Sequence, residues 1–208
     1  MAGRVRAASM EGIAAYSLSA RFAELTATMP GIVVELVSER HLINLTKHEP
    51  DISVSFVPPQ GPRLSVRRVG DFRLAPFASK SYLIRRGGPD TRTDLQDHDF
   101  VYHVDDLIAI EPAHWLSEIR KPTDVVFRST SMAAQQKAVA AGAGIGLLPL
   151  FSAKTNPALV PVLPDAVVVR RDLYLGVHED IGCVGRVRAV TRFLTSLFTD
   201  EAGHLNEF

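Results

Sequence analysis

The chain has 208 residues, of which 46% are hydrophobic and 22% are charged, so it can bury a sizeable core and does not have the composition of a disordered chain. Its 23 Lys and Arg residues balance 23 Asp and Glu residues, and this zero net charge predicts that the chain alone binds nucleic acid poorly. A single cysteine, Cys183, excludes an internal disulfide, and the lack of a long apolar run or a signal-peptide core predicts a cytoplasmic protein with no membrane association.

The first 56 residues alternate between strand-like and helix-like patterns. Apolar runs rich in β-branched residues predict strands, and apolar spacing near 3.6 residues predicts helices. In chain order these are a strand at Val5–Ala8, a helix from Ile13 to Met29, a strand at Ile32–Val37, a short helix carrying Leu42 and Leu45, and a strand at Asp51–Phe56. Alternation of this kind is typical of βαβ units, and it predicts a parallel sheet covered by helices.

Extended segments follow at Leu64–Val69 and Phe72–Phe77, with Gly70-Asp71 as the expected turn between them. Gly87-Gly88-Pro89-Asp90 is the strongest break in the middle of the chain, and we expect a crossing between two lobes there. A second alternating set predicts another α/β lobe. It comprises strands at Phe100–Val104, Val125–Phe127 and Ile145–Leu148, a segment through Trp115, and a helix opened by Thr130-Ser131.

Two strands, Leu159–Leu163 and Leu173–Val177, precede an amphipathic helix. Its apolar stripe comprises Val187, Val190, Phe193, Leu194, Leu197 and Phe198. Such a helix must cover a sheet, and we expect it to return to the first lobe. The predicted fold is therefore α/β with a discontinuous lobe I (residues 1–84 plus 173–208) and a lobe II (residues 85–172).

The segment from Ser131 to Pro149 resembles the helix followed by V-x-x-G-x-G-I-x-x-L-P of LysR-type regulator effector domains. Other segments fall in that family's order and spacing, so that the resemblance covers nearly the whole chain. They are Arg4–Ala8, Phe22–Ile32, Asp51-Ile52, Leu74–Leu83, Leu159–Pro164 and Val184–Phe198.

This resemblance implies a type 2 periplasmic binding protein fold, with two Rossmann-like lobes joined by two crossover segments. It also implies a domain that binds a small-molecule effector in the interlobe cleft to control transcription, and that is not an enzyme. Members of the family form homodimers or tetramers. Their domains form antiparallel dimers, in which a helix and a strand of one lobe lie against the other lobe of the partner. Their DNA contact is made by an N-terminal winged helix-turn-helix, which is absent from this chain.

Ligands of open parallel sheets collect beyond the carboxyl ends of the strands. Applied to the predicted strands, this rule names a set of candidate ligand-binding residues, which are the segments that the resemblance also implicates. In lobe I they are Ser9, Met10, Glu11, Gly12, Ser38, Glu39, His41, Phe56 and Val57, and in lobe II they are Tyr102, His103, Arg128, Ser129, Thr130 and Ser131.

Several of these residues have a simpler interpretation. Ser9, Ser38, Thr130 and Ser131 are candidate helix caps, and Phe56 is a candidate core residue. Glu11 would repel an anionic ligand, which favours a neutral or cationic effector, or an anion held by Arg128 on the other lobe. The alternative is that Glu11 only complements the helix dipole from solvent.

No cofactor or metal is expected, because the histidines, His41 among them, lack metal-ligand spacing. Gly142–Gly146 resembles a dinucleotide loop but follows a helix and precedes a strand, so it is predicted to be a helix-to-strand turn. No nucleophile elbow is present, and His103 has no identifiable nucleophile as a partner. The alternatives to a regulator domain are a solute-binding protein for transport and an enzyme built on the same scaffold.

Overall fold

The computed structural model describes residues 2–39, 50–104, 124–166, 168–200 and 205–206. By its internal contacts the chain divides into two compact units. Unit 1 consists of Met1–Asp71 and Arg171–His204, and unit 2 consists of Phe72–Arg170 and Leu205–Phe208. The boundaries fall inside two long strands, β4 (Leu64–Ser79) and β9 (Val169–His178), whereas the sequence placed them after residues 84 and 172.

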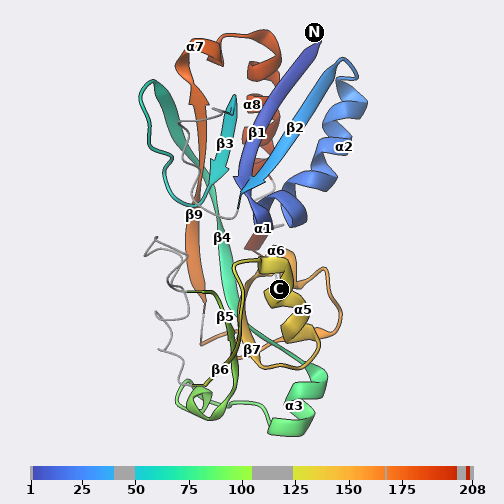
Figure 1. Ribbon diagram of the computed structural model, residues 1–208, viewed down its shortest axis with the longest axis vertical. Coiled ribbons are helices and arrows are strands. Elements are labelled where there is room, and N and C mark those ends of the chain that lie inside the picture. Colours follow the sequence, from blue (N-terminus) through green and yellow to red (C-terminus); the bar gives the residue numbers. More distant parts are fainter. Residues whose placement is uncertain (1, 40–49, 105–123, 167, 201–204, 207–208) are drawn as a thin grey trace. The chain divides into compact units, whose positions relative to one another are not determined.

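In unit 1, β1 (Gly3–Met10) lies between β2 (Ile32–Glu39) and β3 (Ile52–Ser55) and pairs with both in parallel. β9 continues the sheet antiparallel to β3. Helix α2 packs against β2 and helix α8 packs against β1 (Figure 1). The described helices of this unit are α1 (Glu11–Ile13), the π-helical turn η1 (Ala14–Leu18), α2 (Ser19–Thr28), α7 (Glu179–Gly182) and α8 (Gly185–Asp200).

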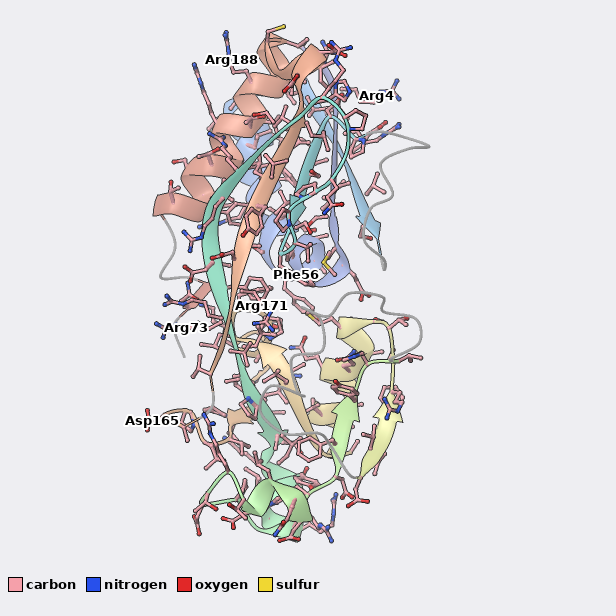
Figure 2. All side chains as sticks on the ribbon, turned by 90° about the vertical axis from the view of Figure 1, so that its left-hand side faces the viewer. Arg4, Phe56, Arg73, Asp165, Arg171 and Arg188 are labelled. Carbon is pink, nitrogen blue, oxygen red and sulfur yellow. The ribbon has the colours of Figure 1, made fainter. Side chains whose placement is uncertain are left out.

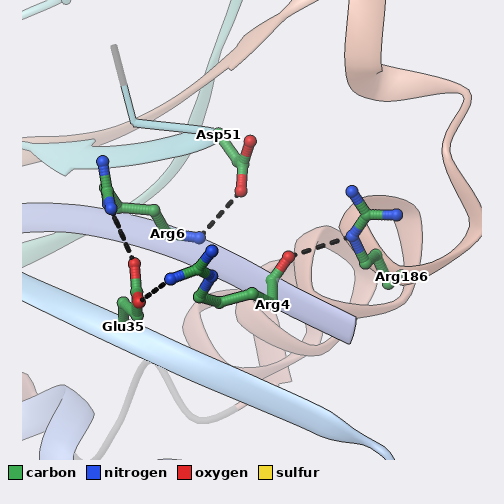
Figure 3. Close-up of polar contacts among 5 residues, drawn as sticks. All are labelled: Arg4, Arg6, Glu35, Asp51 and Arg186. Carbon is green, nitrogen blue, oxygen red and sulfur yellow. Dashed lines mark hydrogen bonds and ion pairs between the residues drawn. The ribbon is translucent and has the colours of Figure 1, made fainter. Parts of the chain in front are cut away.

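Polar contacts at the start of β1 hold this strand to its neighbours (Figure 3). Glu35 on β2 accepts hydrogen bonds from the guanidinium groups of Arg4 and Arg6, at 2.9 to 3.0 Å, and the first cause of its lowered pKa is the bond from Arg6. The Asp51 carboxylate, just before β3, accepts the backbone N–H of Arg6 at 2.8 Å. Arg186 of α8 donates from Nε to the backbone oxygen of Arg4 at 2.9 Å. These contacts join β1 to β2, β3 and α8.

The apolar stripe of α8 forms the core of unit 1 together with β1 and α2. The rings of Phe22 and Phe193 stack with centroids 6.5 Å apart, and this contact joins α2 to α8. Burial of these side chains explains why a helix with exposed arginines on its other face is held on the sheet. The buried residues that α8, β1 and α2 contribute to this core are Val5, Ala7, Phe22, Leu25, Val187, Val190, Leu194 and Phe198.

The turn expected at Gly70-Asp71 is wrong, because β4 runs without interruption through both residues. The glycine serves close packing instead. A Cβ at Gly70 would lie 3.0 Å from the backbone oxygen of Phe198, so a larger residue would push α8 away from the strand. A glycine within an extended run is thus a packing requirement here and not a chain reversal.

In unit 2, β5 (Phe100–Tyr102) pairs in parallel with β6 (Val125–Arg128) and with β7 (Ile145–Pro149). β4 pairs antiparallel with β7 and with β8 (Leu159–Pro161). The expected strand at Leu159–Leu163 ends at Pro161, and Leu163 has a φ of 51° that does not fit a strand. The described helices are α3 (Lys80–Arg86), the 3-10 turn η2 (Asp94–Asp97), α5 (Met132–Ala140) and α6 (Leu150–Ala153).

The glycine-rich segment between α5 and β7 is the helix-to-strand turn that the sequence predicted. Gly142 has a φ of +87°, which favours glycine, directly after the helix. A Cβ at Gly144 would overlap the backbone oxygen of Asp99, and a Cβ at Gly146 would lie 2.5 Å from Val139 Cγ2. The three glycines therefore allow the chain to turn and to pack closely, and they do not form a phosphate-binding loop.

All described strands belong to one hydrogen-bonded order, β2-β1-β3-β9-β4-β7-β5-β6, with β8 beside β4. The expected α/β fold with parallel pairing on each side is confirmed, and the two long strands β9 and β4 are neighbours in the middle of that order. No helix within these described ranges is long and apolar enough to cross a bilayer. The predicted helix with Leu42 and Leu45 and the segment through Trp115 lie outside the described residues.

Candidate functional site

The parallel strands of unit 1 bring most of its predicted site residues to one edge of the sheet. The register pairs Ser9 with Ser38 and Met10 with Glu39, and it also pairs Ser9 with Val54 on the other side. The strand ends therefore lie next to one another, and the chain continues into Glu11 and Gly12 after β1. Phe56 and Val57 follow the end of β3 at the same edge.

Ser9 is fully buried, and its hydroxyl donates to the backbone oxygen of Val54 at 3.0 Å. The cap of α1 is Met10, which makes no side-chain capping bond, so the interpretation of Ser9 as a helix cap is wrong. Its hydroxyl hydrogen already links β1 to β3, which leaves only an oxygen lone pair for another group.

Glu11 is the first residue of α1 and is half-buried. Nearby Tyr16 is also half-buried, and its pKa is raised, first by burial and then by the negative charge of Glu11. Its phenol therefore stays protonated near neutral pH and keeps a hydrogen to donate. This part of the edge thus presents a carboxylate and a neutral hydroxyl.

The other predicted residues of unit 1 differ in exposure. Phe56 is buried, as the interpretation as a core residue required, and Val57 is half-buried with its N–H donating to Ser55 Oγ at 3.1 Å. Ser38 lies in β2 and is exposed, and Glu39 is the last residue of that strand. His41 lies outside the described residues.

In unit 2 the ends of β5 and β6 also lie together, because Tyr102 pairs with Arg128 in the strand register. The rings of Tyr102 and His103 are in contact, with centroids 3.9 Å apart and planes tilted by 38°. The guanidinium carbon of Arg128 lies 5.5 Å from the Tyr102 ring centroid, and its Nη1 donates to the His103 backbone oxygen at 3.1 Å. An arginine, a tyrosine and a histidine therefore form one layered group at this edge, which we call the Tyr102 stack.

Hydroxyl groups surround the start of α5 beside the Tyr102 stack. Ser131 caps the helix by accepting the N–H of Ala134 at 3.2 Å, so the capping interpretation is confirmed for this residue. Ser129 donates its N–H to Tyr102 O at 3.0 Å and accepts the N–H of Ser131 on its hydroxyl at 3.1 Å. Thr130 lies between the two serines and is half-buried.

A family model described as the LysR substrate binding domain matches residues 1–199. This chain belongs to that family. As such it is the effector-binding, regulatory domain of a LysR-type transcriptional regulator, and a transport protein is not the favoured alternative. A comparison with curated proteins finds no match.

Solved structures of LysR-type regulators share the fold. The chain is similar to the CrgA regulatory domain from Neisseria meningitidis, at 20% identity and a TM-score of 0.81, covering 95% of this chain and 100% of that one. It is similar to the AmpR effector domain of Pseudomonas aeruginosa, at 16% identity and a TM-score of 0.76, covering 97% of this chain and 98% of that one. For full-length AphB of Vibrio cholerae the identity is 21% and the TM-score 0.73, with 93% of this chain and 68% of that one covered.

Ser129 and two residues that the sequence did not name, Pro149 and Leu150, also lie at the edge of unit 2 in the LysR-type domain. Ser129 organises the start of α5, and Gln135 donates from Nε2 to its backbone oxygen at 2.6 Å. Pro149 ends β7, which is parallel to β5, so Pro149 and Leu150 reach the same edge as Tyr102. The strand-end rule could have named these last two, because it applies to every parallel strand of the lobe.

The chemistry available at both edges is that of binding. The groups there include hydroxyls, the Arg128 guanidinium, aromatic faces and the Glu11 carboxylate, which are the kinds of group that orient small polar ligands. Among the side chains that the structure describes, no group of three or more His, Cys, Asp or Glu residues could hold a metal ion.

Proposed function

We propose that the effector of this LysR-type domain is a small molecule recognised by residues at the carboxyl ends of its parallel strands. The observation that carries this proposal is the Tyr102 stack. It is a cation and two rings held together at the carboxyl ends of parallel strands, beside a helix start with hydroxyl groups. We propose that the effector regulates the domain by changing its conformation. An effector that binds one conformation more tightly than another shifts the population toward the conformation that it prefers.

The charges at the two edges bear on the chemical class of the effector. Glu11 in unit 1 repels anions, and Arg128 in unit 2 attracts them and offers its guanidinium face to a ring. We therefore propose an effector that is neutral or carries a positive group, or one whose anionic group is held at Arg128. A simple anion bound only at the unit 1 edge is the combination that these charges disfavour.

Thermal-shift screening of a metabolite library tests the site. A ligand present at a hundred times its dissociation constant stabilises the folded chain by about 2.7 kcal/mol, which raises the melting temperature measurably. In the Arg128→Gln variant, anionic ligands should no longer raise the melting temperature. In the Glu11→Gln variant, anionic ligands should raise it more than in the parent chain. The control variant Lys137→Gln removes an exposed positive charge on α5 and should keep the shift. No stabilising compound in a broad library, or shifts that ignore both site variants, would contradict the proposal.

We also propose that the LysR-type domain forms a homodimer through its end strands. β2 and β6 are the two ends of the hydrogen-bonded order, and each exposes large apolar side chains. Val33 on β2 is 60% exposed and Val126 on β6 is 54% exposed, with Val37 and Phe127 beside them in their strands. Apolar end strands are the places where sheet proteins associate.

DNA contact in the whole regulator is proposed for an N-terminal winged helix-turn-helix. The upstream codons would reveal this domain, whereas those of a transport protein would encode a signal peptide.

A further inference from the structure

Helix α8 has a second face that the fold of unit 1 does not use. Opposite its buried stripe it carries Arg188 and Arg192, both exposed and one helical turn apart. The row continues along the helix through hydroxyl side chains at Thr195, Ser196 and Thr199. Figure 2 shows Arg188 projecting away from the ribbon of unit 1.

Neither arginine is explained by helix stability. Like charges four residues apart on a helix destabilise it slightly. Positive side chains near a helix N-terminus also oppose the helix dipole, and the first turn of α8 has no acidic residue. Within the described ranges, no carboxylate forms an ion pair with the guanidinium of Arg188 or Arg192.

Five other arginines that the structure describes in unit 1 form ion pairs with carboxylates, and Arg188 and Arg192 do not. Exposed and half-buried guanidinium groups elsewhere in the unit meet carboxylates of neighbouring strands or helices. The pairs are Arg4 and Arg6 with Glu35, Arg21 with Glu24, Arg63 with Asp180, and Arg68 with Asp71 and Asp172. Since the chain has no net charge, the unpaired positive charge on α8 is a local feature and not part of a general excess.

A third guanidinium extends the row from a different element. Arg67 of β4 is exposed and donates a hydrogen bond to Thr195 Oγ1 on α8. Thr195 in turn donates to the backbone oxygen of Thr191 at 2.6 Å, which fixes the position of its hydroxyl. Three positive groups therefore line about 10 Å of helix, at 1.5 Å of rise per residue between Arg188 and Thr195.

We propose that this α8 row, defined as Arg67, Arg188, Arg192, Thr195, Ser196 and Thr199, binds the phosphate backbone of double-stranded DNA without reading its sequence. Arginine and hydroxyl side chains are the groups that commonly contact phosphates. DNA presents a phosphate about every 3.4 Å along each strand, so a straight row of guanidinium groups meets charges in any sequence. A membrane surface fits less well, because it would require apolar side chains on the exposed face, and those of α8 are buried against the sheet.

Binding of the whole 208-residue chain to an unrelated 20-base-pair duplex, followed by fluorescence anisotropy at 20 to 60 mM salt, tests this proposal. Three phosphate contacts predict that a threefold rise in salt weakens binding about 20-fold, from a slope of about −0.9 per contact. The Arg188→Gln/Arg192→Gln variant keeps one contact and should lose only about threefold over the same range. The matched control is Arg4→Gln/Arg63→Gln, which removes the same charge from exposed arginines that are already paired and should behave as the parent chain.

Circular dichroism of each variant confirms that it is folded before its binding is compared. Absence of salt-dependent binding at 20 mM salt would overturn the proposal. Equal losses in both double variants would also overturn it, because the effect would then be one of overall charge. Competition by polyglutamate as effective as that by DNA of equal charge would show that the row fits acidic protein segments instead.

Discussion

The imidazole of His98 is buried in unit 2 and shares a hydrogen bond with a tyrosine. Tyr82 is also buried, and its hydroxyl oxygen accepts the backbone N–H of Asp99 at 2.9 Å and lies 3.1 Å from His98 Nδ1. The hydroxyl hydrogen is thus available to Nδ1 of a neutral His98 ring. Burial lowers the pKa of His98, and the positive charge of Arg86 lowers it further, against smaller opposing effects of Asp97, Asp99 and Asp94.

This arrangement predicts that stability falls in weak acid. The pKa of His98 in the folded chain is below its unfolded value of about 6.5, so below that pH the unfolded state binds a proton that the folded state refuses. The free energy of unfolding should therefore decrease from pH 7 toward pH 5. In His98→Gln, which can accept the same hydrogen bond but does not titrate, the decrease should be smaller. Urea unfolding of both proteins at the two pH values measures the difference, and equal decreases would show that His98 does not contribute.

Features of single residues could be predicted from the sequence where their cause is local, and not where it is a distant contact. The cap at Ser131 and the left-handed Gly142 were predictable, because both are local backbone requirements at a helix end. Ser9 and Gly70 were misinterpreted as local signals, although each is explained by a neighbour far away in sequence, Val54 and Phe198 respectively. A residue type identifies its chemical options, but only tertiary packing selects among them.

The turn between α5 and β7 depends on how closely two chain segments approach. Gly144 lies against the backbone of Asp99, whose oxygen accepts the N–H of Ile145 at 2.8 Å. This contact aligns the start of β7 with the start of β5, and thereby the two strand ends at the Tyr102 stack. The element is held in place by backbone contacts that admit no side chain.

Replacing Gly144 by alanine should therefore destabilise the chain. The new Cβ would overlap Asp99 O, a rigid backbone atom, and overpacking of this kind costs about 1–3 kcal/mol. Gly88→Ala is the matched control, because Gly88 is exposed and nothing lies within 4 Å of a Cβ there, so its change should stay within about 0.5 kcal/mol. Chemical unfolding measures both variants. An unchanged Gly144→Ala protein would mean that the turn can relax.

The strands, including short ones such as β5 and β6, were predicted from their apolar patterns, whereas short helices such as α3 were not. The strands of both units and α8 have sustained apolar patterns, whereas α3 buries only Tyr82 within seven residues. Its end signals were present in the sequence, since Ser79 caps it by accepting the N–H of Tyr82 at 3.1 Å and Gly87 follows it. β4 was divided in two because the glycine within it looks the same in a strand as in a turn.

Self-association is the property of the whole molecule that the exposed end strands predict. Phe127→Asp places a charge on β6, next to Val126, and should convert a dimer into a monomer because burying an unpaired carboxylate in an apolar interface is costly. Ile84→Asp is the control, because Ile84 is 86% exposed on α3 and not on an end strand. Sedimentation equilibrium of the three proteins at matched concentration measures the mass. A monomeric parent chain, or equal dissociation of both variants, would contradict the proposed dimer.

For the candidate site, the sequence predicted which strand ends are neighbours, but not how their side chains contact one another. Parallel pairing sets which strand ends are neighbours, so Ser9 and Ser38, and also Tyr102 and Arg128, could be grouped before their positions were known. The contact between the Tyr102 and His103 rings and the role of Ser129 depend on side-chain conformations that no sequence period encodes. The effector's identity is a further step away, because a few polar groups at an edge fit many small molecules.

Unit 1 is built from two stretches of chain separated by nearly all of unit 2, and this imposes an order on folding during synthesis. β1 leaves the ribosome first, but α8, which packs against it, is translated only near the end of the chain. The strands of unit 2 are complete before then. A nascent chain stalled before Gly185 should thus have a folded unit 2. Its unit 1 should still expose apolar side chains and depend on chaperones.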